Sequence, residues 1–303
     1  MKKRILICGE ICREITTACA LENEINRADG YTASPGGMGA ELCATLNFYG
    51  NEVQLCTRVG SDNDGKALTR VLESGQFGTS ARFVTTADGC RTSLKMNFDT
   101  PDGKRTVICR ESGLRIGKRD VEDGFMSYPE WVVLCETVGN DGAEEAGLQS
   151  RRKEAGIIVI SAESADYLKS IGRCALLVLT DAEVQGLTAE SLSTTESCTR
   201  ACTALSKLIK SDFVVIELKG RGYFIFDGTF FSMASGYNLP KECLSDDTRI
   251  MFLASLTDAF INSGDGIQDV CKYASTAAAM YVAMKKERIP TRKEIKGYLA
   301  NHK

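Results

Sequence analysis

Histidine is almost missing from this chain, because His302 is the only one among 303 residues. It stands next to the C-terminus, where polypeptides commonly fray. A histidine general base, a Ser-His-Asp triad and a histidine metal site are therefore all disfavoured. Any chemistry that the chain performs is expected to rest on Asp, Glu, Lys or Arg side chains.

Long apolar runs and an excess of positive charge are also lacking. No stretch approaches the roughly 20 apolar residues of a membrane span. The first apolar run, residues 5–8, is too short for a signal peptide and has the length of a buried strand. The formal net charge of −3 gives no electrostatic reason to expect nucleic acid or an anionic membrane as a partner. We therefore expect a cytoplasmic protein that binds neither.

Cysteine is abundant, with 13 residues, but it lacks the spacing of metal or redox sites. There is no C-x-x-C motif, and the closest pairs, Cys8 with Cys12 and Cys198 with Cys202, are each separated by three residues. Most of the cysteines lie in apolar contexts. Free, buried thiols are therefore predicted, and no metal site is expected.

The chain has a regular alternation of short apolar runs and amphipathic segments. Strands are expected over residues 4–8, 53–57, 131–135, 157–160, 176–179 and 213–216. Helices are expected over residues 41–49, 64–73, 247–263, 267–285 and 291–302. Continuous apolar strands that alternate with helices indicate an α/β protein whose parallel sheet is covered on both faces. No linker divides the chain, so a single domain over residues 1–303 is predicted.

Residues 82–110 depart from this rhythm. Strands are expected over residues 82–86, 92–98 and 105–109. Between the last two, Thr100-Pro101-Asp102-Gly103 is a strong signal for a hairpin turn. Several side chains alternate between polar and apolar, as on a half-exposed sheet. We expect a small antiparallel β excursion, joined by residues 11–34, that projects as a lid or an oligomer surface. A hairpin without a function is the alternative.

The most informative local feature is the glycine turn Pro35-Gly36-Gly37-Met38-Gly39, which leads from an extended segment into a helix. Glycines allow backbone amides to approach a ligand closely, and a helix N-terminus favours negative or hydroxyl-rich groups. Alone, this sequence is equally typical of a simple tight turn. A second motif follows it, Val59-Gly60-Ser61-Asp62-Asn63-Asp64-Gly65, directly before another helix.

Together these motifs resemble the N-terminal half of the ribokinase-like sugar and nucleoside kinases, the PfkB-type carbohydrate kinases. That family shows a G-G-x-G-x-N turn and then V-G-x-D-x-x-G. The resemblance continues in order along the chain. Thr180-Asp181-Ala182-Glu183 resembles the family's N-x-x-E segment, Glu217-Leu218-Lys219-Gly220-Arg221-Gly222 resembles its T-L-G-x-x-G hairpin, and residues 273–279 resemble its late alanine-rich helix.

The resemblance implies an α/β fold of the ribokinase-like type: a three-layer sandwich with a central, mostly parallel sheet and a small β lid. It implies a small hydroxyl-rich ligand, with ATP and Mg²⁺ as cofactors if the protein is active. The substrate-binding residues implied by the family pattern are Glu14, Gly36, Gly37 and Glu41. The nucleotide-binding residues implied in the same way are Thr180, Glu183, Lys219, Gly220, Gly222 and Ser275.

The family's second signature is the segment that differs most. In the family, D-T-x-G-A-G-D opens a long helix, its glycine amides form an anion hole for the transferred phosphoryl group, and its last Asp is the base. Here the segment reads Leu244-Ser245-Asp246-Asp247-Thr248-Arg249-Ile250. Ile250 stands at the position of the base and cannot accept a proton. Asp247 and Arg249 stand at the glycines, and a carboxylate there would repel a γ-phosphate unless Mg²⁺ intervened. Asp246 and Asp247 would also suit a helix cap.

Other family positions have changed as well, although the scaffold glycines remain. The family has Asn at the positions of Glu41, Thr180 and Ser275. It has the Thr and Gly of T-L-G at the positions of Glu217 and Lys219, and Asp-Pro at the position of Ser161-Ala162. The pattern indicates that the fold was kept while phosphoryl transfer was not.

Three functions fit these observations. The favoured hypothesis is a relative of the sugar kinases that is impaired in phosphoryl transfer, a pseudokinase candidate that acts by ligand binding or assembly. The alternative is an active carbohydrate kinase that uses Asp247 or Asp246 as base with Mg-ATP, and Lys219 or Arg249 as a charged clamp. A third hypothesis, compatible with the first, is a structural module that forms a homodimer through the β lid.

Overall fold

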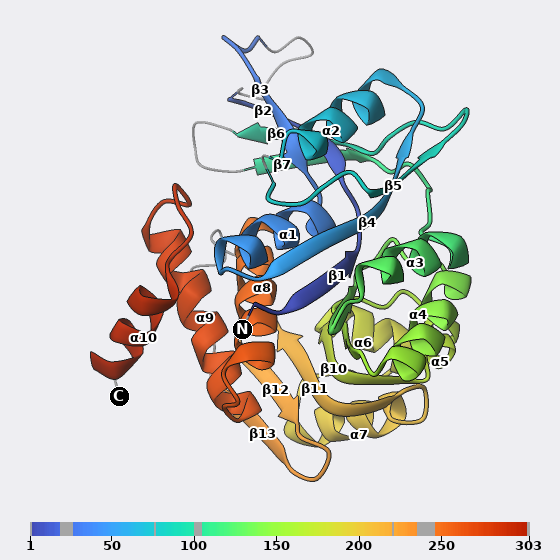
Figure 1. Cartoon of the computed structure of the whole chain (residues 1–303). Helices are drawn as coiled ribbons and strands as arrows, with labels where there is room; N and C mark the ends of the chain where they lie inside the picture. Colours follow the sequence, from blue (N-terminus) through green and yellow to red (C-terminus); the bar gives the residue numbers. More distant parts are fainter. Residues whose placement is uncertain are drawn as a thin grey trace.

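The predicted parallel sheet is the centre of the molecule (Figure 1). The computed structural model describes residues 2–18, 27–75, 77–99, 105–219, 221–234 and 246–301. Over these residues, nine strands form the sheet in the order β13-β12-β11-β10-β9-β8-β1-β4-β5. Pairing is parallel from β5 to β11 and antiparallel from β11 to β13. The strands are β1 (Arg4–Cys8), β4 (Glu52–Gly60), β5 (Phe83–Ala87), β8 (Trp131–Leu134), β9 (Gly156–Val159), β10 (Arg173–Thr180), β11 (Lys210–Leu218), β12 (Gly222–Phe226) and β13 (Phe231–Ala234).

Side chains of the central strand β1 alternate between two hydrophobic cores, as the two-residue period of a strand requires. Ile5 and Ile7 pack into one core, and Leu6 and Cys8 pack into the other. All four are buried, which explains why the strand is a continuous apolar run in the sequence. The sheet is therefore the middle layer of three, and each face is covered by helices.

The helices divide between these two faces. Those with residues in the first core are α1 (Met38–Phe48), α2 (Asn63–Glu73), α8 (Asp246–Asn262), α9 (Ile267–Ala283) and α10 (Arg292–Asn301). Those with residues in the second are α3 (Lys118–Gly124), α4 (Asn140–Lys153), α5 (Ala165–Ile171), α6 (Asp181–Thr188) and α7 (Thr195–Leu205), and the short 3-10 helix η1 (Phe125–Ser127) follows α3. The helices predicted from periodicity are confirmed with shifts of a few residues at their ends.

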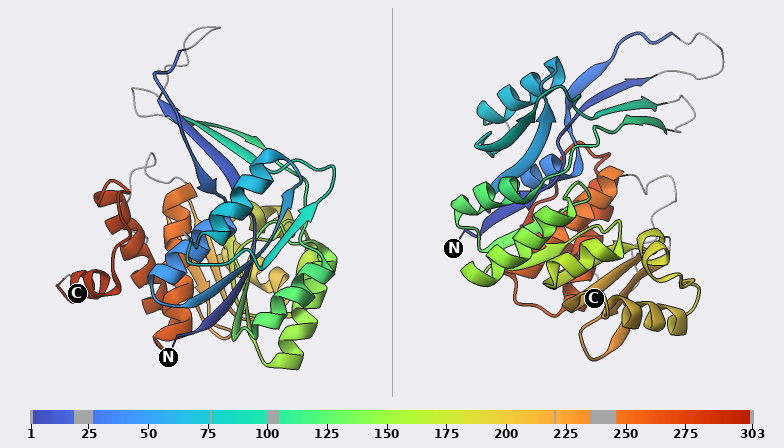
Figure 2. Two further views of the ribbon diagram at one scale, coloured as in Figure 1. Left: turned by 45° about the horizontal axis from the view of Figure 1, so that its top comes forward. Right: turned by 90° about the vertical axis from the view of Figure 1, so that its right-hand side faces the viewer.

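A second, four-stranded sheet forms the lid and projects from one end of the main body (Figures 1 and 2). Its order is β3-β2-β6-β7, with β2 (Cys12–Ala18), β3 (Thr32–Gly36), β6 (Leu94–Asp99) and β7 (Arg105–Arg110). Within residues 11–34, β2 pairs with β3 and with β6, so the described part of this segment lies in the lid sheet. The predicted turn at residues 100–103 lies outside the described residues.

Two details of the predicted lid were wrong. The segment predicted at residues 82–86 is β5, which pairs with β4 at the edge of the main sheet and does not belong to the lid. Phe83 turns its side chain into the second core, and this burial explains why the strand lies on the main body. In addition, β2 and β6 run parallel, so the lid is a mixed sheet.

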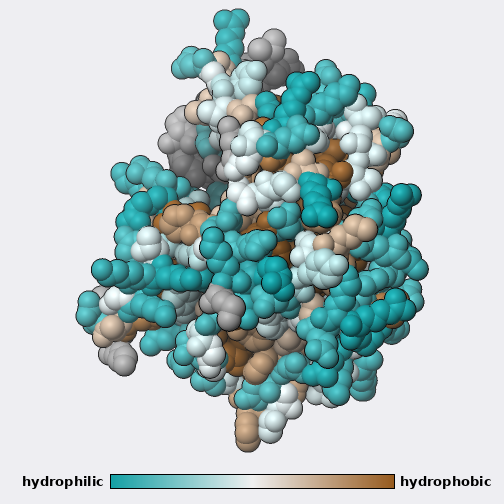
Figure 3. Space-filling view, in the orientation of Figure 1, coloured by the Kyte–Doolittle hydropathy of each residue, from teal (hydrophilic) through white to brown (hydrophobic). Residues whose placement is uncertain are grey.

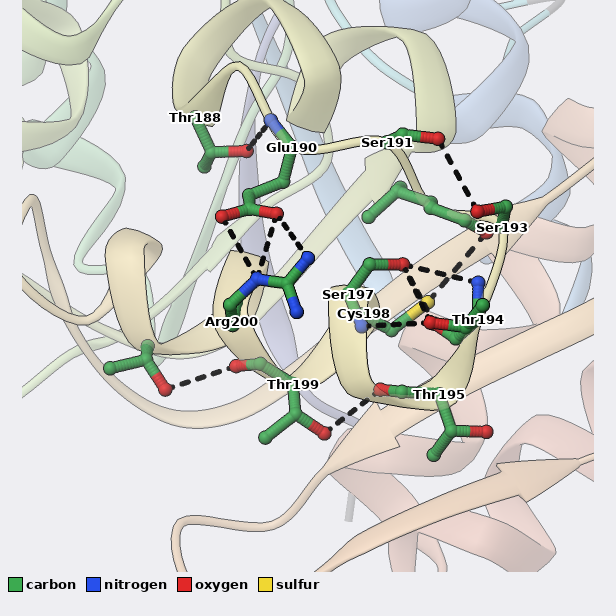
Figure 4. Close-up of polar contacts among 12 residues, drawn as sticks. Thr188, Glu190, Ser191, Ser193, Thr194, Thr195, Ser197, Cys198, Thr199 and Arg200 are labelled. Carbon is green, nitrogen blue, oxygen red and sulfur yellow. Dashed lines mark hydrogen bonds and ion pairs between the residues drawn. The ribbon is translucent and has the colours of Figure 1, made fainter.

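The link between α6 and α7 is held by local side-chain hydrogen bonds and by the burial of Leu192 in the second core (Figure 4). The Thr194 hydroxyl accepts a hydrogen bond from the Ser197 amide at 3.2 Å, and the Ser197 hydroxyl accepts one from the Thr194 amide at 3.1 Å. This reciprocal cap satisfies amide donors that the first turn of a helix otherwise leaves unpaired. Nearby, Arg200 forms an exposed ion pair with Glu190 at 3.0 Å.

Hydrophilic residues cover most of the face shown in Figure 3, and hydrophobic residues appear mainly in patches between them. In the described part of the chain, no helix combines the length and the apolar character needed to cross a bilayer.

Candidate functional site

A cleft of about 260 Å³ lies between the lid and the carboxyl edge of the main sheet. Open α/β sheets usually bind their ligands at this edge, because loops from several strands converge there. The lining residues on which the description below depends come from the ends of β1 and β8, the starts of α1 and α8, and the lid. They are Glu10, Gly37, Glu41, Lys95, Glu136, Asp246, Arg249 and Ile250.

The glycine turn fixes one wall of the cleft. Gly37 has a φ of 97° and stands directly before α1, so the turn needs a residue that tolerates the left-handed region. Gly39 lies against the loop after β1, where an added Cβ would come within 2.6 Å of the carbonyl carbon of Gly9. The glycines therefore bring the start of α1 against the end of β1, and Gly37 reaches the cleft surface.

Two of the four residues predicted on the substrate side line the cleft, namely Gly37 and Glu41. Burial, assisted by the nearby carboxylates of Glu14 and Asp247, raises the pKa of Glu41 to about 7. Glu14 instead accepts a hydrogen bond from the Asn97 side chain within the lid sheet and is not among the cleft residues. Gly36 ends β3, where it packs beneath the Glu14 side chain.

The start of α8 places its two aspartates differently. Asp246 lines the cleft and forms an ion pair with Lys95 of the lid at 3.1 Å. Asp247 forms an ion pair with Lys286, beyond the end of α9, at 3.3 Å. Ile250, one turn later, is 6% exposed and contributes an apolar surface to the cleft. Of the two proposed alternative bases, only Asp246 is therefore a lining residue of the cleft.

The guanidinium group of Arg249 is bound by other groups of the protein. Its Nε lies 3.0 Å from Oε1 of Glu217, at the end of β11, and its Nη2 donates to the backbone oxygen of Ile160 at 3.3 Å. Oε2 of Glu183 lies 3.9 Å away. Burial raises the pKa of Glu217, and the charge of Arg249 partly offsets this effect. The guanidinium group thus already has carboxylate partners.

Thr180 and Glu183, predicted on the nucleotide side, form the cap of α6. The Thr180 hydroxyl accepts from the Glu183 amide at 3.2 Å, and Oε2 of Glu183 accepts from the Thr180 amide at 2.7 Å. The other oxygen of Glu183 accepts from the Ser161 hydroxyl at 2.5 Å and the Ala162 amide at 3.1 Å. The retained glutamate therefore ties the ends of β9 and β10 together.

Lys219, Gly222 and Ser275, also predicted on the nucleotide side, are not among the residues that line the cleft. Lys219 is exposed, and its amide donates to Asp181 at 3.3 Å. Gly222 begins β12 with a φ of 92°, a conformation that favours glycine, so the turn between β11 and β12 accounts for this residue. Ser275 is 3% exposed and donates to the backbone oxygen of Cys271 at 2.9 Å. Gly220 lies outside the described residues.

The described residues at the start of α8 leave little uncompensated positive charge for a nucleotide triphosphate. Phosphate sites concentrate positive charge and free amide donors. At the start of α8, by contrast, Arg249 is matched by Glu217 and Glu183, and Asp246 is matched by Lys95. Within the described residues, no group of three or more His, Cys, Asp or Glu side chains has an arrangement suited to a metal ion.

Several residues of the cleft, and of a second cavity beside it, were missed by the sequence predictions, among them Glu136, Lys95, Arg115 and, in the second cavity, Tyr167. Glu136 lies just after β8, at the carboxyl edge of a parallel strand, so its position could have marked it as a candidate. Lys95 and Tyr167 carry no comparable sequence signal, because only the placement of the lid and of α5 brings them to the site.

Comparison with known proteins connects this cleft to a family. The model of the pfkB family carbohydrate kinases matches residues 2–242. Among solved structures, the ribokinase of Arabidopsis thaliana complexed with ribose and ATP is 18% identical, with a TM-score of 0.78 and 98% of each chain covered. A ribokinase from Thermotoga maritima is 14% identical, with a TM-score of 0.73 and coverage of 98% of this chain and 99% of the other.

A mutant of phosphofructokinase-2 from Escherichia coli is 12% identical, with a TM-score of 0.77 and 99% of each chain covered. No curated protein sequence matched the chain. Similarity at this level of identity establishes the ribokinase-like fold, and the family model, which covers most of the chain, establishes the ancestry. The chain therefore belongs to the pfkB family of carbohydrate kinases.

Proposed function

We propose that this protein binds a small hydroxyl-rich ligand in the cleft beneath the lid and is impaired in phosphoryl transfer. The observation that carries the proposal is the pairing of Arg249 with Glu217 at the start of α8, one residue before Ile250. In an active member of the family, this helix start would supply the anion hole and the base.

The physical reason is the distribution of charge. Phosphoryl transfer depends on stabilising negative charge on the transferred group. Glu217 and Glu183 already compensate Arg249, so a triphosphate would have to displace them or be placed beside them. The aliphatic side chain of Ile250 offers no proton acceptor to a substrate hydroxyl.

Retention of ligand binding is supported by the features that remain. The glycine turn, the lid and the carboxyl edge of the sheet still enclose the cleft. Carboxylates at its surface, such as Glu10 and Glu41, can accept hydrogen bonds from the hydroxyl groups of a sugar. Concave sites with a few convergent polar groups are typical of small-molecule binding.

The alternative is an active kinase that uses Asp246 or Asp247 with Mg-ATP. The position of Asp246 in the cleft favours this reading, because a carboxylate there is a possible proton acceptor. To act as the base, Asp246 would either have to leave its ion pair with Lys95 or be held by Lys95 in a position from which it reaches the substrate. Asp247 would have to leave Lys286.

A turnover screen separates the two functions. Purified protein is incubated with ATP, Mg²⁺ and a panel of sugars and nucleosides, and ADP release is measured, with titration calorimetry of Mg-ATP alongside. We expect no release above background and no binding of Mg-ATP tighter than millimolar. Turnover that is abolished by Asp246→Asn or Asp247→Asn, but not by Asp269→Asn near the start of α9, would overturn the proposal and establish the alternative.

A further inference from the structure

A second cavity, of about 250 Å³, adjoins the cleft on the side of α4 and α5. The two cavities share three lining residues, Arg115, Glu136 and Glu163, so they lie side by side. We call the second cavity the inner pocket. Its other polar residues include Ser161, after β9, and Tyr167, in α5.

The inner pocket contains buried polar atoms that no protein group satisfies. Tyr167 is 5% exposed, and its hydroxyl has no hydrogen-bond partner. Oε2 of Glu136 is likewise shielded from solvent and has no partner. A buried polar atom without a partner costs about 1–3 kcal/mol, so native proteins rarely keep one without a reason. Both atoms belong to residues that line the same small pocket.

The charges around Glu136 leave it without a cation of its own. Arg115 makes a two-point ion pair with Glu163, with distances of 3.0 and 2.7 Å, and contacts Glu136 only through its backbone oxygen at 2.6 Å. Arg249 is engaged by Glu217. Burial, together with the carboxylates of Glu10 and Glu183, raises the pKa of Glu136 to about 7, although the charge of Arg249 opposes this shift. The pocket is therefore short of positive charge and rich in acceptors.

A protonated amine matches these requirements. An ammonium group carries three N–H donors and one positive charge. Three residues that line the inner pocket, Glu136, Tyr167 and Ser161, carry side-chain oxygens that can accept a hydrogen bond. The Ser161 hydroxyl directs its hydrogen to Glu183, which leaves its lone pairs for another donor. A phosphate or carboxylate group would lie beside the carboxylates of Glu136 and Glu163, and the nearby cation, Arg115, is already paired with Glu163.

We propose that the inner pocket binds the protonated amine of an amino sugar or a related amino polyol, whose hydroxyl groups occupy the adjoining cleft. This inference rests on the proposed ligand-binding function and specifies the class of ligand. Glu136 supplies the counter-charge, and Tyr167 and Ser161 orient the amine.

Titration calorimetry at pH 7.0 tests the inference with matched pairs: glucosamine with glucose, galactosamine with galactose, and mannosamine with mannose. We expect at least one amino sugar to bind ten-fold or more tightly than its parent hexose. Glu136→Gln should remove most of this preference, and Tyr167→Phe should weaken amine binding several-fold. Glu144→Gln, on the exposed side of α4, is the control and should change neither affinity.

The outcomes separate this inference from the proposed function. Hexose binding without an amine preference, or a preference that survives in Glu136→Gln, overturns the amine site but leaves a ligand-binding protein. Absence of binding for all six sugars overturns both. Turnover of ATP with an amine preference intact overturns only the impaired phosphoryl transfer. Thermal melting of each variant checks folding, and Glu136→Gln should melt no lower than the wild type because it removes an unpaired buried carboxylate.

Discussion

At the scale of single residues, Arg249 has the largest effect on what the cleft can do. A glycine at this position would leave the start of α8 open to an anion, whereas Arg249 fills it and pairs with Glu217. Both side chains are largely buried, with 23% and 17% of their surfaces exposed. Removal of one member of such a pair leaves the other charge buried without compensation.

Replacement of Arg249 by Met should therefore destabilise the fold by about 3 kcal/mol at pH 8. Burial raises the pKa of Glu217 even in the presence of Arg249, so loss of Arg249 should raise that pKa further. A raised carboxyl pKa favours the folded state at low pH, where the group is protonated, and penalises it at high pH. The loss should consequently be smaller at pH 5 than at pH 8 in urea unfolding.

Arg200→Met is the matched control. Arg200 pairs with Glu190 at the exposed surface between α6 and α7, where solvent screens the interaction (Figure 4). Its replacement should leave the unfolding curve within experimental error. An effect as large as that of Arg249→Met would show that charge burial is not the cause. The double variant Arg249→Met, Glu217→Met should recover most of the lost stability.

Glu41 gives a second prediction at this scale. Its pKa of about 7 lies well above the value in an unfolded chain, so between these values the folded state binds the proton more strongly. Its contribution to the free energy of unfolding therefore falls as the pH rises from about 4.5 to 7. Glu41→Gln should flatten this part of the pH profile and stabilise the protein by about 1 kcal/mol or more at pH 8.

The measurement is urea unfolding of wild type and Glu41→Gln at pH 5, 6, 7 and 8. The exposed Glu144→Gln serves as the reference for loss of one carboxylate far from the cleft. Parallel pH profiles for wild type and Glu41→Gln would contradict a buried, protonated Glu41.

At the scale of elements, the contact between α1 and β1 explains the glycine turn better than ligand binding alone. The backbone of Gly39 lies against Gly9 and Glu10, with no room for a side chain. The neighbouring atoms belong to the backbone, so they cannot move aside as a flexible side chain could. The turn therefore joins a helix to the central strand and, through Gly37, forms one wall of the cleft.

Gly39→Ala should cost about 3 kcal/mol or more, because the added methyl group would lie 2.6 Å from the carbonyl carbon of Gly9. Gly297→Ala in α10 is the control, because no atom lies within 4 Å of the position of its new methyl group. That change should stabilise the protein by about 0.5–1 kcal/mol through helix propensity. Thermal or urea unfolding of both variants provides the comparison, and equal effects would refute the close-contact explanation.

At the scale of the whole molecule, a homodimer through the lid stays a prediction. The lid sheet ends at β7, where Val107 and Ile108 are 40% and 50% exposed. An exposed apolar edge strand is a common site for pairing with another chain. Deletion of residues 82–110 would not test this idea cleanly, because it would also remove β5 from the main sheet.

Point substitutions are the sharper test. If the lid forms the dimer, light scattering should give twice the chain mass of 32.9 kDa for the wild type and a single chain mass for Val107→Lys, Ile108→Lys. Phe230→Lys, beside β13 on the opposite edge of the main sheet, is the control and should remain dimeric. The same mass for the wild type and the lid variant would rule out a dimer formed by these residues.

The sequence by itself determined the layered α/β fold and the lid. Continuous apolar strands such as β1 require cover on both faces. The glycines within residues 36–39 allow the chain to turn tightly into α1. It also placed Ile250 where a base would be needed. The strand and glycine features are local, because each follows from the residue type and its immediate neighbours, whereas the position of Ile250 follows from the resemblance to the family signature.

Only the tertiary structure decided which charged side chains meet. Arg249 and Glu217 are 32 residues apart, and Lys95 and Asp246 are 151 apart. The same holds for Phe83–Ala87, whose pattern fits a lid strand but whose partner is β4. Glu14 bonds to Asn97, and Tyr167 and Glu136 line one pocket, for the same reason. Such pairings depend on how strands and helices are placed in space, and a pattern along one chain does not contain that information.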